Sequence, residues 1–275
     1  MKRVNELSSE IIARGSLALA LFLRDGTAGW IEPVRPARTI CALSFAGVNS
    51  SGPPFVEIAA KLTQLQHRDG GWSDSEETAW ATAAIRLFRG QDDFTVQAAI
   101  QWLRGIRRPS GGWGRHPRDQ ARIPTTALVS ALVPEVVRLE DTAWLAGEWQ
   151  QDFDSPVRLS YKAGFYLLAT TQGQEDQLVA ETISHLARDQ NDDGGFAPWR
   201  GHPIGSDPWS TGVVLWGLSR WSDLVDHKVF EKALDWLRAS QLPSGYWAYH
   251  YLDDGTSLAL IGAVAALKAL AKGCK

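Results

Sequence analysis

The sequence has few cysteines, little net charge and no long uncharged apolar run, and each absence excludes a class of protein. It contains 2 cysteines in 275 residues, too few for a disulfide framework or a cysteine-based zinc site. The formal net charge of −3 argues against a nucleic-acid partner. The uncharged stretch at residues 255–267 is shorter than the roughly 20 residues that a membrane-spanning helix needs.

The N-terminal segment has a charged start and a short apolar run, as a signal peptide would. However, Glu6, Glu10 and Arg14 interrupt the run, and no small-residue cleavage site follows it. We therefore expect this segment to be the first helix. We also expect a cytoplasmic protein, with peripheral membrane contact as the alternative.

A glycine followed by an aromatic residue recurs at nearly even spacing along the chain. The aromatic positions are Trp30, Trp72, Trp113, Phe196 and Trp247. The first three are 42 and 41 residues apart, and Phe196 follows Trp113 after 83, or two periods. A degenerate copy is therefore expected near Trp149 to Phe153. A period of this length indicates stacked repeats, so we predict six repeats of about 42 residues in a single domain over residues 1–275.

Each repeat contains two segments of different character. Charged amphipathic segments precede the glycine–aromatic pairs, at residues 55–66, 94–104, 176–188 and 228–241, and predict helices with one solvated face. Nearly uncharged segments follow, at residues 39–46, 78–85, 126–133, 211–218 and 256–267, and predict buried helices. Each uncharged segment begins with threonine, which we expect to be its N-cap. The predicted fold is an all-α (α/α)6 toroid of six outer and six inner helices.

The best-preserved repeat runs from Leu62 through Gln66, Asp69 and Trp72 to Thr78. Its pattern, Leu-x-x-x-Gln-x-x-Asp-Gly-Gly-Trp followed by Thr-Ala, resembles the prenyltransferase and squalene-cyclase repeat superfamily. That superfamily includes zinc-dependent protein prenyltransferases and class II terpene cyclases. Trp209 stands where the zinc branch has a thiolate, so the resemblance implies no metal site here. Mg2+ would be needed only if the substrate is a diphosphate.

The resemblance also implies an acid. Class II terpene cyclases carry Asp-x-Asp-Asp-Thr-Ala, and this chain has Asp74-Ser75-Glu76-Glu77-Thr78-Ala79 in the same register. Glu76 takes the place of the proton donor, and Asp74 and Glu77 flank it. Asp254 is a further candidate for the acid, because it stands two residues before Thr256, just as Glu76 stands two residues before Thr78. The alternative is that these carboxylates only stabilise helix N-termini, where the backbone dipole favours negative charge.

The expected substrate is a hydrophobic small molecule, because aromatic walls suit an apolar ligand and their π faces stabilise a carbocation. The candidate substrate-binding residues are Trp80, Trp209, Trp216, Tyr161, Phe165, Tyr249, His250, Arg122 and Asp207. Ordinary core packing is the alternative for Trp80 and Trp216. The arginine-rich stretch at residues 104–122 is expected to be mostly solvated surface.

The sequence is compatible with three functions. The first is acid-initiated cyclisation of a polyene or isoprenoid. The second is another biosynthetic reaction that uses Asp254, His250 or Tyr249 for acid–base work in the same cavity. The third is a non-catalytic toroid that binds a lipid or a protein. The loops at residues 114–124 and 197–208, or a second copy of the chain in a homodimer, are the candidates for closing the cavity.

Overall fold

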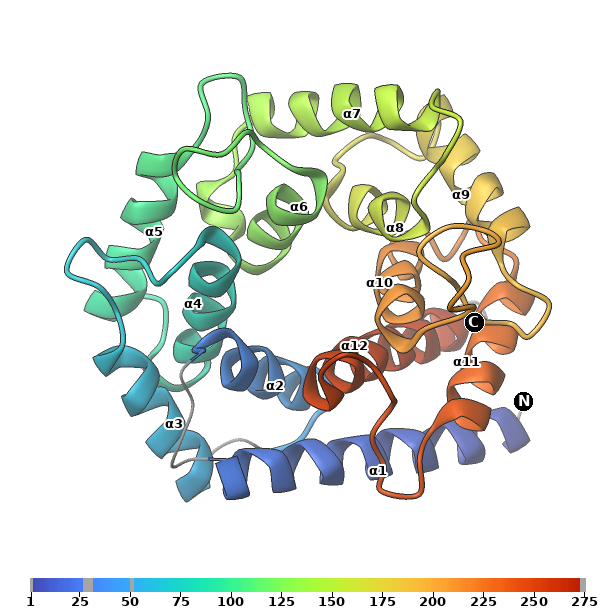
Figure 1. Ribbon diagram of the computed structural model, residues 1–275, viewed down its shortest axis with the longest axis horizontal. Helices are drawn as coiled ribbons and strands as arrows, with labels where there is room; N and C mark the ends of the chain where they lie inside the picture. The colour runs from blue at the N-terminus through green and yellow to red at the C-terminus, as the bar shows by residue number, and fades with distance from the viewer. Residues whose placement is uncertain (1, 27–31, 50–51, 273–275) are drawn as a thin grey trace. The chain divides into compact units, whose positions relative to one another are not determined.

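The computed structural model describes residues 2–26, 32–49 and 52–272, and within these the chain is built from α-helices (Figure 1). The helices are α1 (Lys2–Gly26), α2 (Val34–Phe45), α3 (Pro53–Gln64), α4 (Ser75–Arg89), α5 (Phe94–Ile106), α6 (Ile123–Leu132), α7 (Leu139–Phe153), α8 (Ser160–Ala169), α9 (Gln177–Asp189), α10 (Pro208–Ser219), α11 (His227–Ser240) and α12 (Leu252–Lys272), with the short 3-10 helix η1 (Pro134–Val136) after α6. The predicted all-α class is confirmed. The predicted anchor Trp30 lies outside the described residues.

Helix contacts divide the chain into two compact units. The terminal unit comprises Met1–Ala20 and Trp149–Lys275, and the middle unit comprises Leu21–Glu148. In the terminal unit α10 lies between α8 and α12, with α9 packed on α8 and α11 on α10 and α12 (Figure 1). In the middle unit α4 lies between α2 and α6, and α3 and α5 pack against it. Mostly buried and half-solvated helices therefore alternate within each unit. The predicted organisation of residues 1–275 as a single domain stays a prediction.

The buried helices of the terminal unit approach each other at glycines. A Cβ atom on Gly217 of α10 would lie 2.1 Å from the carbonyl oxygen of Gly164 in α8. A Cβ atom on Gly212 of α10 would lie 2.2 Å from the carbonyl oxygen of Leu258 in α12. Because only a hydrogen atom fits at these crossings, α8, α10 and α12 pack backbone against backbone.

The same hydrogen bonds join each glycine–aromatic turn to the helices on either side. The backbone N–H of Trp72 donates to Thr78 Oγ1 at 3.0 Å, and its indole Nε1 donates to the carbonyl of Leu62 at 3.1 Å. At Trp113 the same two bonds are made to Thr126 and Leu103. At Trp247 they are made to Thr256 and Leu237. Phe196 makes only the backbone bond, to Thr211. The motif thus fixes where each buried helix begins relative to the half-solvated helix before it.

The glutamine of the motif connects successive repeats. Gln66 Nε2 donates to the carbonyl oxygens of Gly70, in its own turn, and Thr95, in the next half-solvated helix, at 2.8 and 2.9 Å. The equivalent bonds are made by Gln190 to Gly194 and Val229, and by Gln241 to Gly245 and Ile11. A side-chain amide that donates to two carbonyls from different segments couples neighbouring helix pairs.

The prediction that threonines cap the buried helices was wrong. Thr78 lies inside α4, and its hydroxyl donates to the carbonyl of Asp74 at 2.7 Å. The N-cap of α4 is Asp74, and Asp207 caps α10 in the same way. The buried helices therefore begin three to five residues earlier than predicted. The prediction began each buried helix at its threonine, after the acidic residues, but acidic side chains are favourable in a first helical turn.

Among the described residues, α12 has the length and composition of a membrane span, with 21 residues. It extends beyond the uncharged run at residues 255–267 in both directions. Of its most apolar window, 72% is buried against the rest of the chain. Packing within the fold therefore accounts for its apolar character.

Candidate active site: a carboxyl cluster and an aromatic cluster

The first candidate site is the carboxyl cluster at the start of α4 in the middle unit, formed by Asp74, Glu76 and Glu77. Asp74 is buried, and its Oδ1 accepts the backbone N–H of Glu77 at 2.8 Å. Its Oδ2 accepts Arg115 Nε at 2.9 Å, which forms an ion pair with the loop that follows Trp113. Ser75 Oγ donates to the carbonyl of Gly114 at 2.7 Å, so the same loop is bound twice to the start of α4.

Glu76 makes a different contact from its neighbours. It is half-buried, and its Oε1 accepts the hydroxyl of Thr125 at 2.7 Å. Thr125 lies in the first turn of α6, so this bond joins two adjacent buried helices. The capping interpretation therefore holds for Asp74, whereas Glu76 is bound to a side chain of the next helix.

Glu77 is the acid of the cluster that has a raised pKa. It is 8% exposed, and burial raises its pKa above the usual value, with the negative charges of Asp74 and Glu32 adding to the effect. A hydrogen bond with Ser73 acts in the opposite direction. Within the described part of the chain, Glu77 Oε2 has no hydrogen-bond partner. The environment thus favours the protonated form of this carboxyl group.

The second candidate site is the aromatic cluster of the terminal unit. Trp209, in the first turn of α10, is at its centre. Its ring centroid lies 5.6 Å from that of Tyr161 and 5.8 Å from that of Phe165, both on α8 and both edge-to-face. The ring of Tyr249 stacks on Trp209 at 6.4 Å and contacts His250 at 4.8 Å. The structure thus brings together five of the predicted substrate-binding residues, from three segments distant in sequence.

Asp207 adjoins the aromatic cluster, two residues before Trp209. It is 5% exposed, and its Oδ1 accepts the backbone N–H of Ser210 at 2.8 Å. Burial raises the pKa of this carboxyl, while hydrogen bonds from Ser210 and Trp209 and the charge of His202 lower it by less. Its Oδ2 is buried and has no hydrogen-bond partner among the described residues.

The other predicted site residues are divided between the two units. Trp80 on α4 is 1% exposed, which supports core packing for this side chain. Arg122, the N-cap residue of α6, is exposed. Trp216 on α10 and Asp254 in the first turn of α12 are half-buried in the terminal unit. Among the described residues no group of three or more His, Cys, Asp and Glu side chains could hold a metal ion.

Sequence reasoning missed two residues that donate hydrogen bonds to the carboxyl cluster. Arg115 was counted with the solvated basic stretch, but it pairs with buried Asp74. Thr125 was given no role, although it donates to Glu76. Both follow the next glycine–tryptophan pair, at Trp113. Their position one repeat after the acidic run is the signal that could have identified them.

Comparison with known proteins gives weak sequence matches. No protein-family model matches the chain. A squalene–hopene cyclase of Bradyrhizobium diazoefficiens is 27% identical over 92 residues, which cover 27% of this chain and 14% of that enzyme. One of Zymomonas mobilis is 24% identical over 195 residues, covering 66% of this chain and 26% of that enzyme. The chain thus spans about a quarter or less of the curated relatives it matches.

The structural matches cover nearly the whole chain. A variant of the type II terpene cyclase MstE from Scytonema, in complex with its substrate geranylgeranyl dihydroxybenzoate, has a TM-score of 0.74 at 16% identity over 95% of this chain and 99% of that one. MstE without ligand gives 0.71 at 16% identity, over 95% and 98% of the two chains. A protein from Actinoplanes gives 0.68 at 13% identity, over 96% and 99%. Identity this low establishes the fold alone, and the chain therefore has the class II terpene cyclase-like fold that its glycine–aromatic repeats predict.

Proposed function

We propose that this protein is a terpene cyclase that starts its reaction by protonating an alkene of a hydrophobic polyene or isoprenoid. The observation that carries the proposal is the carboxyl cluster at the start of α4. Three acidic side chains gather there, one of them ion-paired with Arg115 and another, Glu77, with a raised pKa. Buried carboxyl groups that retain a proton are suited to general-acid chemistry. The fold shared with type II terpene cyclases supports this reaction class.

Glu76 is the proton donor in this proposal. Its O–H bond breaks as one alkene carbon gains the hydrogen, and the positive charge develops on the more substituted carbon. The electron pair of the next double bond closes the ring, and loss of a proton ends the sequence. The hydroxyl of Thr125, 2.7 Å from Glu76 Oε1, would stabilise the carboxylate that remains after proton transfer.

The neighbouring acids position and tune this donor. The ion pair between Asp74 and Arg115 fixes the first turn of α4, on which Glu76 stands. Burial of Glu77 favours its neutral form, which limits the negative charge beside Glu76. A donor supported in this way is held close to one geometry, as efficient proton transfer requires.

The aromatic cluster of the terminal unit has side chains that suit an apolar ligand or a cation. Trp209 offers the largest π face, and Tyr161, Phe165 and Tyr249 surround it. Aromatic faces attract cations without trapping them as a nucleophile would. The substrate of MstE carries a geranylgeranyl chain on an aromatic acid, and we propose prenylated polyenes as the substrate class of this chain as well.

The proposal is tested by incubating the protein with a panel of isoprenoids, prenylated aromatic acids and isoprenoid diphosphates, followed by product analysis. Glu76→Gln should reduce turnover by roughly 100-fold or more, because it removes the transferable proton and keeps the shape. Asp254→Asn is a matched change in the first turn of α12, and it should reduce turnover less than Glu76→Gln does. Full activity in both variants would refute the acid assignment, and the reverse order of sensitivity would favour acid–base chemistry at Asp254.

A second arrangement of the same reaction places the acid at Asp207. The observation that favours it is a buried carboxyl with a raised pKa and an unpaired oxygen, among the described residues, next to the aromatic cluster. Asn is as good an N-cap as Asp, so Asp207→Asn should fold normally. Loss of turnover in this variant with retention in Glu76→Gln would move the acid from α4 to α10.

The remaining expectations accompany this proposal. Mg2+ should be required only for diphosphate substrates, so a chelator should leave turnover of non-phosphorylated polyenes unchanged. A cytoplasmic location, peripheral contact with membranes and a homodimer that closes the cavity stay predictions, and sedimentation of the purified protein measures the last of them.

A further inference from the structure

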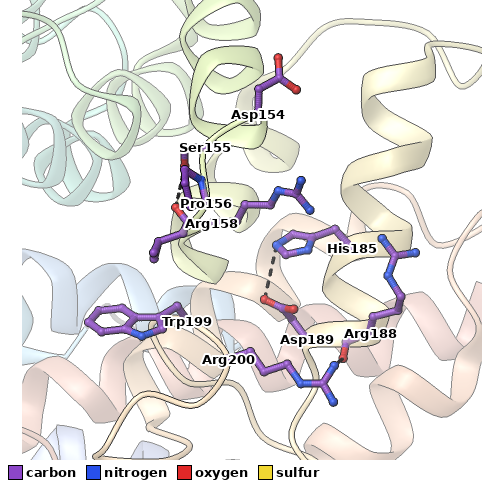
Figure 2. A pocket seen from close by; sticks show the side chains of 10 residues that line it. Asp154, Ser155, Pro156, Arg158, His185, Arg188, Asp189, Trp199 and Arg200 are labelled. Carbon is purple, nitrogen blue, oxygen red and sulfur yellow. Dashed lines mark hydrogen bonds and ion pairs between the residues drawn. The ribbon is translucent and has the colours of Figure 1, made fainter.

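A pocket in the terminal unit belongs to neither cluster. Its volume is about 600 Å3, and it is open to solvent. Figure 2 shows the side chains that line it. The pocket lies between the segment that follows α7, the last turns of α9 and the loop between α9 and α10. Three arginines, a His–Asp pair and one tryptophan supply the side chains that matter: Arg158, Arg188, Arg200, His185, Asp189 and Trp199.

Two of the arginines are held in place by neutral groups. The Nε of Arg158 donates to the carbonyl of Phe153, and its guanidinium lies 4.5 Å from the centre of the Phe153 ring. Arg200 donates from one terminal nitrogen to the carbonyl of Arg188 at 2.8 Å. Each guanidinium has five N–H donors, so these contacts leave several unused. The cations are thus oriented in advance without being neutralised.

The acidic side chains of the pocket contact groups other than the three arginines. Asp189 lies 3.4 Å from His185 Nε2 and accepts the hydroxyl of Ser160 at 3.5 Å. Asp154 accepts the side-chain amide of Gln150 at 3.1 and 3.2 Å. Over the described ranges, no ion pair joins a carboxylate to any of the three arginines.

His185 lies close to two of the arginines. It is buried, and burial is the main cause of its lowered pKa; the charge of Asp189 opposes this shift, and the charges of Arg158 and Arg188 add to it. Both guanidinium groups are therefore close enough to act on the same ring. The lining carries three arginines and two aspartates, so it has an excess of positive charge with His185 neutral.

We propose that this pocket binds the phosphoryl group of a small organic phosphate or diphosphate. One guanidinium satisfies one carboxylate by a bidentate pair, whereas three guanidinium groups match an anion with several oxygens and at least two negative charges. Trp199 is 36% exposed and borders the same pocket, so an apolar or aromatic group attached to the phosphate can pack against its ring. The site is independent of the proposed cyclase reaction.

Calorimetric titration of the full chain at low salt tests the proposal. Inorganic diphosphate should bind saturably, and phenyl phosphate should bind more tightly than inorganic phosphate because its ring contacts Trp199. Arg188→Gln and Arg200→Gln should each weaken diphosphate binding roughly tenfold or more, since each removes charge-assisted hydrogen bonds. Trp199→Ala should remove only the preference for phenyl phosphate.

Arg238→Gln is the matched control, because Arg238 lies on α11 in an ion pair with Asp235. It should bind diphosphate like the wild type, and so should Glu76→Gln, whatever becomes of the cyclase proposal. The proposal is overturned if the wild type binds no diphosphate, if benzoate binds as tightly as diphosphate, or if Arg238→Gln weakens binding as much as Arg188→Gln. Thermal melts of every variant establish that the comparison is between folded proteins.

Discussion

Replacing Thr78 by valine should lower the melting temperature, because it removes the acceptor on which the glycine–tryptophan turn depends. The Thr78 hydroxyl is fully buried and accepts the backbone N–H of Trp72 at 3.0 Å. Trp72 is itself buried, so water cannot replace the lost partner. Valine has the same shape as threonine, and the perturbation is therefore confined to the hydrogen bond.

The expected magnitude follows from the two bonds of the hydroxyl. Leaving the buried Trp72 N–H without a partner costs about 1–3 kcal/mol. The second bond, donated to the carbonyl of Asp74, matters less because that carbonyl still accepts the backbone N–H of Thr78 at 3.0 Å. In a protein of this size about 1 kcal/mol shifts the melting temperature by about 2–4 °C, so we expect a decrease of about 2–12 °C.

Thr82→Val is the matched control on the same helix. Thr82 is equally buried, but its hydroxyl only donates to the carbonyl of Thr78, and the structure records no backbone N–H that depends on it among the described residues. Its loss should therefore cost about 1 kcal/mol or less. Scanning calorimetry gives both melting temperatures, and hydrogen exchange should show faster exchange of the Trp72 amide only in Thr78→Val. Equal melting temperatures for the two variants would refute the reasoning.

Two other predictions concern stability. Asp207→Asn should stabilise the protein increasingly as the pH rises above about 3.8, the ordinary value for aspartate, because the raised folded-state pKa means that ionisation of Asp207 opposes folding. Thermal melts at several pH values test this, and a gain that shrinks with rising pH would contradict it. Gly217→Ala should destabilise by more than about 2 kcal/mol, because the new Cβ would meet the carbonyl of Gly164 at 2.1 Å. Gly147→Ala on α7, where nothing lies within 4 Å, should instead stabilise by about 0.5–1 kcal/mol in urea denaturation.

The alternation of half-solvated and buried helices was predictable because it follows from the local pattern of charged and apolar residues. Each glycine–aromatic pair separates a charged amphipathic segment from an uncharged one, and burial follows that difference in the structure. The aromatic cluster was predictable for the same reason. Tyr161, Trp209 and Tyr249 each lie at or just before the start of a buried helix, and adjacent helices that start at the same end bring such residues together.

The details that define chemistry were not predictable in this way. Arg115 and Asp74 are 41 residues apart, and composition cannot distinguish an arginine that pairs with a buried aspartate from one that is solvated. The arginine pocket was missed because Arg158, Arg188 and Arg200 come from three separate segments, which are the residues after α7, the end of α9 and the loop before α10. The threonine caps were misassigned because threonine both caps helices and accepts hydrogen bonds inside them.

The first turns of α4 and α10, which are both capped by aspartate, show which acidic positions belong to the repeat and which do not. Asp74 and Asp207 stand four residues before Thr78 and Thr211, and each caps its helix with Oδ1. That position is a property of the repeat. Two residues after the cap, however, α4 has Glu76 and α10 has Trp209, so the same backbone position carries an acid in one helix and an aromatic ring in the other. Because capping does not require an acid there, loss of Glu76 should affect turnover, whereas loss of the Asp74 side chain should lower the stability of α4 as well as disturb the position of Glu76.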